Sequence, residues 1–296
     1  MLQSRQSEAF LAVAETGSFE LAAEKLCITA SAVTLRLQTL EKQLGQVLIL
    51  RERPCRVTQV GQILLQHLQH TRLMQQNLLQ QLQGQDTHSG FYQVNIATNA
   101  DSLATWLLPL LRDLLIKQNI TVHFQVDDQS ETHHLLEAGL VNACVTTEPQ
   151  AMKGCIAEYL GSMNYRFTAT PSFVKQWFPQ GVHRDALRQA PALIFNEKDY
   201  LHTHYIQQNF GLSPSQYPHY FIPSSTAFVD AMVMGLGYGW LPDYQVKKFL
   251  DTGELIEISP QFQIQLALYW HHWKQQSQQL QHLTAHLIQY AHHVLN

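Results

Sequence analysis

The feature that most constrains the fold is a run of three short amphipathic segments between residues 5 and 44. Ser18 and Thr29 precede the second and third segments, where a hydroxyl can accept hydrogen bonds from the free amides of a helix N-terminus. Gly45 follows the third segment and suits the left-handed conformation that ends a helix. The pattern predicts three packed helices with a short turn between the last two. The residues expected on their buried faces include Leu21, Ala22, Leu26, Val33, Leu37, Leu40 and Leu44.

An arginine-bearing stretch follows the third helix. Residues 47–57 alternate short apolar runs with arginines around Pro54, which is typical of a two-stranded hairpin. Two helices joined by a short turn and followed by such a hairpin form a winged helix-turn-helix, whose last helix enters the DNA major groove. A plain three-helix bundle with a solvated arginine face is the alternative interpretation. The residues expected to contact DNA are Ser18, Thr29, Ser31, Thr34, Arg36, Gln38, Arg51, Arg53 and Arg56.

One long helix is predicted from Thr58 to about Leu82, rich in Gln and Leu and nearly uncharged. A small domain does not need such a helix for its own core. We therefore expect its apolar stripe to be exposed and to pair with a second copy of the chain, giving a dimer or a tetramer. The stripe comprises Val60, Leu64, Leu68, Leu78 and Leu82, and the polar residues 83–90 after it are expected to form a linker.

Beyond the linker, strand-like and helical runs alternate in the rhythm of an open α/β sheet. Two such halves with a cleft between them are expected, and ligands bind at the carboxyl ends of the strands. The expected strands are 93–97, 121–126, 143–146, 166–168, 192–195, 219–222 and 265–270, and the expected helices are 102–117, 132–139, 227–235 and 276–295. The predicted domains are a winged helix-turn-helix at 1–58, a dimerisation helix at 59–84, lobe I at 91–167 with 268–296, and lobe II at 168–267.

The net charge of −4, with histidine neutral, at first argues against a nucleic-acid partner. Its distribution removes that objection, because residues 1–60 carry seven Lys or Arg against six Asp or Glu, whereas residues 85–296 carry eleven against seventeen. A local positive cluster is sufficient for DNA binding. The sequence shows neither a secretory signal nor an apolar segment long enough to span a bilayer, so a cytoplasmic protein is expected.

The cleft is expected to bind a small molecule through residues at two helix starts and several strand ends. Asn99-Ala100-Asp101-Ser102 follows a predicted strand and opens a helix, so its amides and hydroxyl can receive a carboxylate. Ser224-Ser225 repeats the arrangement, and nearby acidic residues can pair with a cationic ligand. Helix capping and solvated loops are the alternative interpretation. The candidates are Asn99, Asp101, Ser102, Asp127, Glu148, Ser224 and Ser225, with Asp128 beside them.

Other classes of function lack support in the sequence. His282 and His286 have a spacing that can chelate zinc, but no third ligand is evident, so no metal is expected. No GxSxG, P-loop, GxGxxG or HExxH motif is present, so neither catalysis nor a cofactor is expected. The four cysteines lack CxxC spacing and are expected to be free thiols, with a redox switch through Cys144 and Cys155 left open.

Residues 10–65 resemble the DNA-binding domain of LysR-type transcriptional regulators. The matching residues are Ala22-Ala23, Leu26, Ser31 to Val33, Leu40-Glu41, Leu44-Gly45, Arg51, Thr58 and Gly61. The resemblance implies a DNA reader, a long dimerisation helix, a hinge, and a two-lobed domain similar to periplasmic binding proteins. It also implies a transcription regulator that binds double-stranded DNA, with RNA polymerase as a further expected partner. The two-fold symmetry of a dimer predicts that the DNA site is pseudo-palindromic.

Within that family the chain is most similar to the lysine- and arginine-responsive ArgP regulators, also known as chromosome replication initiation inhibitors. The similarity rests on residues 25–29, 99–109, 207–210, 224–229, 253–256 and 268–271. It implies lysine or arginine as effector and control of amino-acid transport or metabolism genes; a different small effector is the alternative. Ala30 and Leu35 stand where these relatives place polar residues, so the preferred operator is expected to differ. The glycine-rich residues 235–240 also depart from the pattern.

Overall fold

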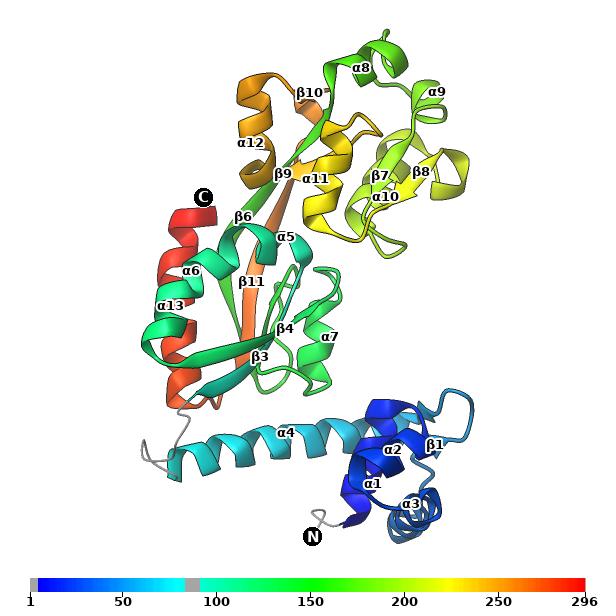
Figure 1. Ribbon diagram of the computed structural model, residues 1–296, viewed down its shortest axis with the longest axis vertical. Coiled ribbons are helices and arrows are strands. Elements are labelled where there is room, and N and C mark those ends of the chain that lie inside the picture. Colours follow the sequence, from blue (N-terminus) through cyan, green and yellow to red (C-terminus); the bar gives the residue numbers. More distant parts are fainter. Residues whose placement is uncertain (1–4, 83–90, 296) are drawn as a thin grey trace. The chain divides into compact units, whose positions relative to one another are not determined.

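The computed structural model describes residues 5–82 and 91–295, which belong to two compact units (Figure 1). One unit comprises Met1–His88 with Glu137–Val141, and the other comprises Ser89–Leu136 with Asn142–Asn296. We refer to them as the reader unit and the effector unit. The predicted linker at residues 83–90 lies outside the described residues.

The reader unit begins with the three predicted helices, α1 (Arg5–Thr16), α2 (Phe19–Leu26) and α3 (Ala30–Leu44). The predicted helix boundaries are confirmed by the caps. The Ser18 hydroxyl accepts hydrogen bonds from the amides of Glu20 and Leu21, and the Thr29 hydroxyl accepts one from Ala32. Gly45 ends α3 with φ of 66°. The helices share one core, which includes Phe10, Val13, Ala22, Val33, Leu37 and Leu40.

Two of the leucines expected in that core lie at the surface instead. Leu21 is 51% exposed and Leu44 is 41% exposed. Leu21 lies in the first turn of α2, beside the buried pair Ala22 and Ala23, and these two alanines fill the contact of α2 with the core. The expectation was wrong because apolar periodicity on an eight-residue helix does not fix which of its neighbouring positions faces inward.

The wing and the long helix follow as predicted. Strands β1 (Ile49–Leu50) and β2 (Arg56–Val57) pair antiparallel, and α4 runs from Gln59 to Leu82. The Glu41 carboxylate accepts hydrogen bonds from the amides of Leu48 and Ile49 and so fixes the start of the wing to α3. The Thr58 hydroxyl donates to the Val47 carbonyl and accepts from the Gly61 amide, which fixes the start of α4 to the wing.

Part of the α4 stripe expected to be exposed is buried in the reader unit itself. Leu64 and Leu68 join the core formed by α1, α2 and α3. The exposed apolar residues near the start of α4 are Val60 and Ile63, the latter 66% exposed. The expectation failed because three short helices bury too little apolar surface alone, and the first turns of α4 complete their core. The side chains of Leu78 and Leu82 lie outside the described residues.

The effector unit is built on a seven-stranded mixed sheet with the order β10-β6-β11-β5-β3-β4, in which β9 also pairs with β6. Strands β3 and β4 pair parallel, as do β3 and β5, whereas β11 lies antiparallel to both β5 and β6. A separate parallel pair is formed by β7 (Ala192–Ile194) and β8 (His219–Phe221). The sheet strands are β3 (Tyr92–Thr98), β4 (Ile120–Val126), β5 (Ala143–Thr146), β6 (Cys155–Ala169), β9 (Gly239–Pro242), β10 (Ile256–Glu257) and β11 (Ile264–Trp273).

Two long strands cross between the lobes. The predicted lobe boundaries at 167/168 and 267/268 fall inside β6 and β11, which are each continuous through the change of lobe. Their pairing is irregular between Leu268 and Tyr269, opposite the segment that contains Gly161 with φ of 138°. Strand β6 was predicted only over residues 166–168, because its first part lacks a clear alternation of apolar and polar residues.

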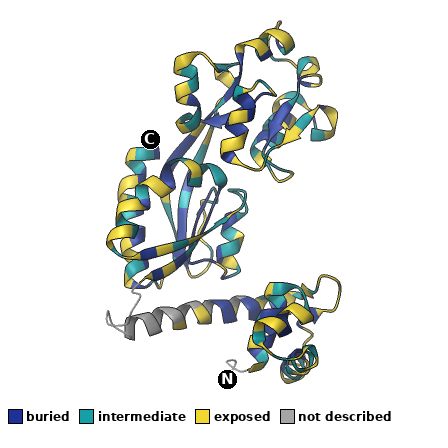
Figure 2. Cartoon of the chain, in the orientation of Figure 1, coloured by how far each residue is buried: buried dark blue, intermediate teal, exposed yellow. Residues whose placement is uncertain are grey.

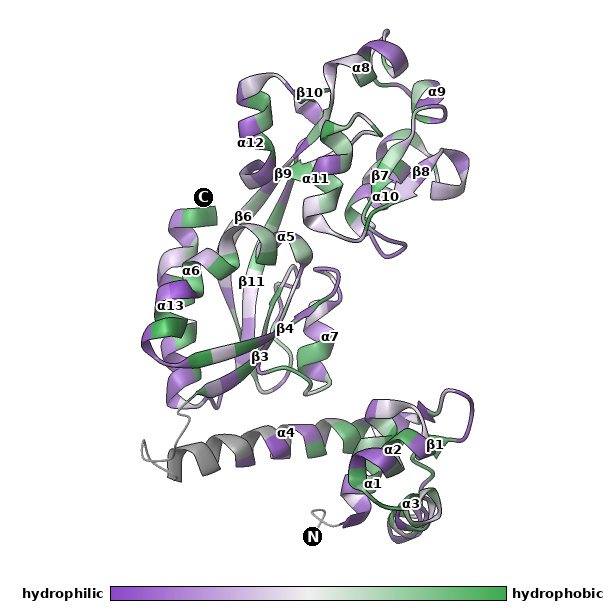
Figure 3. Ribbon diagram, viewed as in Figure 1, coloured by the Kyte–Doolittle hydropathy of each residue, from purple (hydrophilic) through white to green (hydrophobic). Residues whose placement is uncertain are grey.

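Helices cover the sheet of the effector unit. In lobe I, α13 packs against β6 and α6, and α7 lies on the other side of the sheet (Figure 1). Burial is concentrated along the strands (Figure 2), and α13 presents both hydrophobic and hydrophilic residues (Figure 3). The helices are α5 (Ala100–Ser102), the π-helical turn η2 (Leu103–Leu107), α6 (Leu108–Lys117), α7 (Thr132–Glu137), α8 (Pro171–Trp177), α9 (Arg184–Leu187), α10 (Tyr200–Phe210), α11 (Ser225–Val233), α12 (Asp243–Thr252) and α13 (Gln278–Leu295). Among the described helices, none has both the length and the apolar character needed to cross a lipid bilayer.

Candidate DNA-binding surface and effector pocket

The third helix of the reader unit has one packed side and one solvent side. Val33, Leu37 and Leu40 are buried and define the packed side. With about 100° of rotation per residue, Ser31, Leu35, Gln38 and Lys42 fall roughly opposite to it. Ser31, Leu35, Gln38 and Lys42 are all exposed. The solvent side of α3 is therefore available to a partner such as the major groove of DNA.

The residues predicted to contact DNA occupy different environments. Ser18 and Thr29 serve as helix N-caps, and the Thr29 and Ser31 hydroxyls lie 3.0 Å apart within hydrogen-bond distance. Thr34 and Arg36 are half-buried at the flanks of α3. Arg51, Arg53 and Arg56 of the wing are exposed, and the Arg51 guanidinium lies 5.6 Å from the centre of the Phe19 ring. The contacts of these residues with DNA stay predictions.

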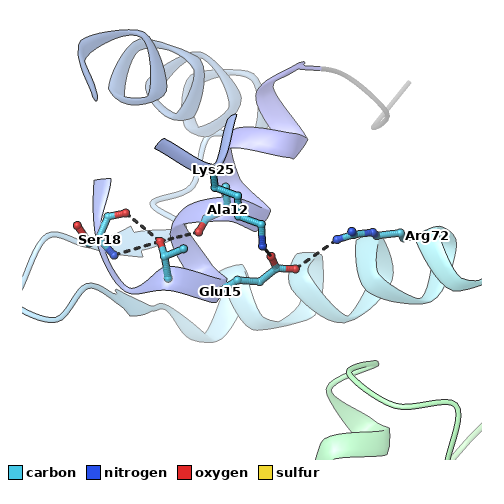
Figure 4. A network of polar contacts seen from close by, with 6 residues as sticks. Ala12, Glu15, Ser18, Lys25 and Arg72 are labelled. Atoms are coloured by element: carbon cyan, nitrogen blue, oxygen red, sulfur yellow. Dashed lines mark hydrogen bonds and ion pairs between the residues drawn. The ribbon is translucent and has the colours of Figure 1, made fainter. Parts of the chain in front are cut away.

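An ion-pair network fixes α4 to α1 and α2, which precede it in the chain (Figure 4). The Glu15 carboxylate accepts from Lys25 of α2 at 2.5 Å and from Arg72 of α4 at 3.5 Å. Beside it, the Thr16 hydroxyl lies 2.7 Å from the Ala12 carbonyl and 2.9 Å from the Ser18 carbonyl. These contacts tie the end of α1 to α2 and to α4.

A pocket opens in the effector unit between the two lobes. Its walls come from the carboxyl ends of β3 and β4 in lobe I, from β9 and the start of α11 in lobe II, and from β6, which serves both. The lining residues are Asn99, Ala100, Asp101, Asp127, Asp128, Gln129, Tyr165, Phe195, Asp199, Leu201, Ser225, Phe228, Trp240, Leu241, Pro242 and Gln245. Four of them are aspartates, and none of these described lining residues is Lys or Arg.

Asp101 connects three elements of the fold through its carboxylate. Its carboxylate accepts hydrogen bonds from the Ser225 hydroxyl at 2.7 Å and from the Tyr165 hydroxyl at 2.9 Å, and so joins α5, α11 and β6. Burial raises the pKa of Asp101, and these two hydrogen bonds oppose the rise. A carboxyl whose pKa is raised by burial gains most from a neighbouring positive charge, because that charge stabilises its ionised form.

The other acids line the same pocket. Asp199 caps α10 by accepting from the His202 amide, and burial raises its pKa as well. Asp128 accepts from the backbone amide and the hydroxyl of Ser130. Asp127 lies 3.4 Å from the exposed ammonium of Lys198.

Two acceptors in the pocket have no hydrogen-bond partner among the described residues. They are the buried amide oxygens of Asn99 and Gln245. The amide nitrogens of these two side chains are engaged, by Gln129 and by Ser225 respectively. Buried acceptors left open in this way cost free energy unless a ligand or water donates to them.

Four of the seven residues predicted for the effector site line the pocket, namely Asn99, Asp101, Asp127 and Ser225. The other three lie elsewhere. The Ser102 side chain is buried, the Ser224 hydroxyl caps α11, and the Glu148 carboxylate accepts from the Gln150 amide. The sequence interpretation missed Asp199, Tyr165 and Gln245. Asp199 follows β7 and precedes α10, so the rule that ligands bind at strand ends could have found it.

Several side chains considered for other roles are engaged in the fold. Trp270 is buried and its indole donates to Thr284, so it belongs to the core. His286 contacts the Leu110 carbonyl, and no cluster of three metal-ligating side chains occurs within the described residues. Cys144 and Cys155 are free and buried, and burial raises the pKa of the Cys155 thiol to about 12, which disfavours the reactive thiolate.

Comparison with known proteins places both units in one family. Residues 4–62 match the model described as bacterial regulatory helix-turn-helix protein, lysR family, and residues 90–291 match the LysR substrate binding domain. The chain belongs to the LysR family. It is accordingly a DNA-binding transcriptional regulator with an N-terminal helix-turn-helix and a LysR-type effector domain, and the predicted fold class is confirmed.

Individual LysR-type relatives are similar over nearly the whole chain. The HTH-type transcriptional regulator ArgP of Photobacterium profundum is 40% identical over 283 residues, which cover 96% of this chain and 94% of that relative. The crystal structure of ArgP from Mycobacterium tuberculosis is 32% identical, with a TM-score of 0.79 and 98% of each chain covered. Full-length LysG of Corynebacterium glutamicum with bound effector arginine is 31% identical, with a TM-score of 0.70 over 97% of this chain and 96% of that one. The predicted resemblance to ArgP regulators is thereby confirmed.

Proposed function

We propose that the regulator responds to lysine or arginine bound in the pocket between the lobes. The observation that carries the proposal is the imbalance of the lining, which has four carboxyl groups and no Lys or Arg among its described residues, although Asp127 also lies near the exposed ammonium of Lys198. An ammonium or guanidinium group donates several hydrogen bonds and carries the missing charge. The relative LysG, whose structure contains effector arginine, supports the same ligand class.

The contacts of the ligand with individual residues are assigned from the charges in the pocket and from the acceptor atoms that have no hydrogen-bond partner among the described residues. Asp101 and Asp199 pair with positive groups of the ligand, and the amide oxygens of Asn99 and Gln245 accept its remaining N–H groups. The ligand carboxylate faces the N-terminus of α11, where Ser225 lines the pocket. Binding in this place links the two lobes and is the event that alters transcription of genes for amino-acid transport or metabolism.

A thermal-shift screen of the full-length protein against the twenty amino acids tests the effector. Lysine or arginine is expected to raise the melting temperature, whereas norleucine, which lacks the side-chain ammonium, is not. Stabilisation by a different amino acid alone would overturn the assignment. It would leave the family membership and the DNA-binding role intact.

Asp101→Asn is the variant that tests the site. Its affinity for the effector is expected to fall roughly 10- to 100-fold, because a charge-assisted contact is lost. The stability of the protein without ligand is expected to change little, because the neutral amide removes the cost of a buried charge but keeps an acceptor oxygen for only one of the two hydroxyl groups. Asp230→Asn is the matched control, since Asp230 is an exposed acid of α11 outside the pocket. Equal loss of affinity in both variants would contradict the proposed site.

We further propose that the chain associates with a second copy through α4. The exposed apolar side chains of Val60 and Ile63 support this, since a second copy would remove them from water. Ile63→Glu is expected to shift the sedimentation coefficient towards that of the monomer, whereas the exposed polar position Gln75, changed to Glu, is not. An unchanged assembly in Ile63→Glu would rule out this face.

A further inference from the structure

The solvent side of α3 has an apolar side chain at its centre. Leu35 is 65% exposed and lies one helical turn from both Ser31 and Gln38. A single exposed leucine is ordinary on a protein surface. The position of Leu35 is informative because it lies almost opposite the buried residues Val33 and Leu37, where α3 projects furthest from its own core.

The hydroxyl groups around Leu35 are engaged within the helix. The Thr39 hydroxyl donates to the Leu35 carbonyl at 2.8 Å, and the Thr29 hydroxyl accepts from the Ala32 amide while contacting Ser31. These groups are less available to base edges than their number suggests. The long side chains on the solvent side are Leu35, Gln38 and Lys42, and Leu35 is the apolar one among them.

We infer that Leu35 packs against the C5-methyl group of a thymine in the DNA major groove and so selects thymine at one position of each half-site. Thymine is the standard DNA base that presents a methyl group in that groove, and apolar side chains recognise it by contact. The inference rests on the DNA-binding role of the family and not on the proposed effector. 5-Methylcytosine carries a methyl group at the same ring position, so it serves as a second probe.

The test begins with a duplex that the full-length protein enriches from a randomised DNA pool. Each thymine of that duplex is replaced in turn by deoxyuridine, which lacks only the methyl group, and the dissociation constant is measured for each duplex. Loss of one buried methyl contact corresponds to about 0.8 kcal/mol, or roughly a 4-fold weaker complex. One thymine per half-site is expected to show this loss with the wild type, and 5-methylcytosine opposite guanine at that position is expected to restore part of it relative to cytosine.

Variants assign the methyl contact to Leu35. Leu35→Ala is expected to bind the thymine and uracil duplexes equally, whereas Leu44→Ala, at the exposed C-terminal end of the same helix, is expected to keep the wild-type difference. If Leu35→Ala fails to bind any duplex, Leu35→Met and Leu35→Gln are compared instead. Only the methionine variant is expected to retain the preference for the thymine duplex over the uracil duplex. A wild type indifferent to every uracil replacement, or a preference that persists in Leu35→Ala or Leu35→Gln, would overturn the inference.

Discussion

The reader unit and the effector pocket differ in the sign and the exposure of their charged groups. Arg51, Arg53 and Arg56 extend from the wing into solvent, whereas burial raises the pKa values of Asp101 and Asp199 in the pocket. Exposed cations act on a polyanion through a field that salt screens. Buried carboxyls respond to pH and to a cation in direct contact with them. Salt and pH are therefore the two variables that should separate DNA binding from effector binding in this chain.

The largest effect is expected from the wing arginines. Replacing Arg51, Arg53 and Arg56 together by Gln should weaken DNA binding roughly 100-fold or more and lower the salt dependence of log K by about 3 per chain. Titration of a DNA duplex from about 50 to 200 mM salt measures both quantities. Arg112→Gln, at an exposed arginine of the effector unit, is the control and should change neither. A triple variant with the wild-type salt slope would show that the wing does not contact phosphates.

A smaller effect, on stability, is expected from Gly61→Ala. A Cβ atom at this position would lie 2.2 Å from the Leu48 carbonyl oxygen, and a backbone atom cannot move away cheaply. The reader unit should lose roughly 2–4 kcal/mol of unfolding free energy. Far-UV circular dichroism follows both units, whereas tryptophan fluorescence follows the effector unit alone, because all five tryptophans lie at Trp106 or later. Gln59→Ala is the control, and an early fluorescence transition in Gly61→Ala would contradict a defect confined to the reader unit.

The helices of the reader unit could be predicted because their signals are local. The hydroxyls of Ser18 and Thr29 and the glycine at 45 act on amides and carbonyls within a few residues, and each has the predicted role. Burial is less local. Leu64 was expected to be exposed but is buried, because it packs against helices more than twenty residues earlier in the chain.

The pocket could be predicted only in part, for the same reason. Asn99 and Asp101 follow a strand directly, so their place at a strand end is visible in the sequence. Tyr165 reaches Asp101 from 64 residues away, along a fifteen-residue strand that serves both lobes. Ser225 meets Asp101 from a distance of 124 residues. Contacts between residues this far apart in the sequence depend on the order of strands in the sheet, which short-range patterns do not encode.

The last predicted effect concerns pH and is the most specific to the pocket. Burial raises the pKa values of Asp101 and Asp199, so these carboxyls take up protons at a higher pH than exposed ones. A cationic effector pairs with the ionised forms, so binding releases protons, and affinity should fall by up to about tenfold per pH unit for each proton as the pH is lowered. Calorimetry between about pH 5 and 8, in buffers of different ionisation enthalpy, measures affinity and proton release together. In Asp101→Asn, the dependence of effector affinity on pH should be weaker than in the wild type. If lysine or arginine bound with constant affinity and no proton release, the acids that hold the ligand would have to be already ionised in the free protein, and the opposition between a salt-sensitive surface and a pH-sensitive pocket would not hold.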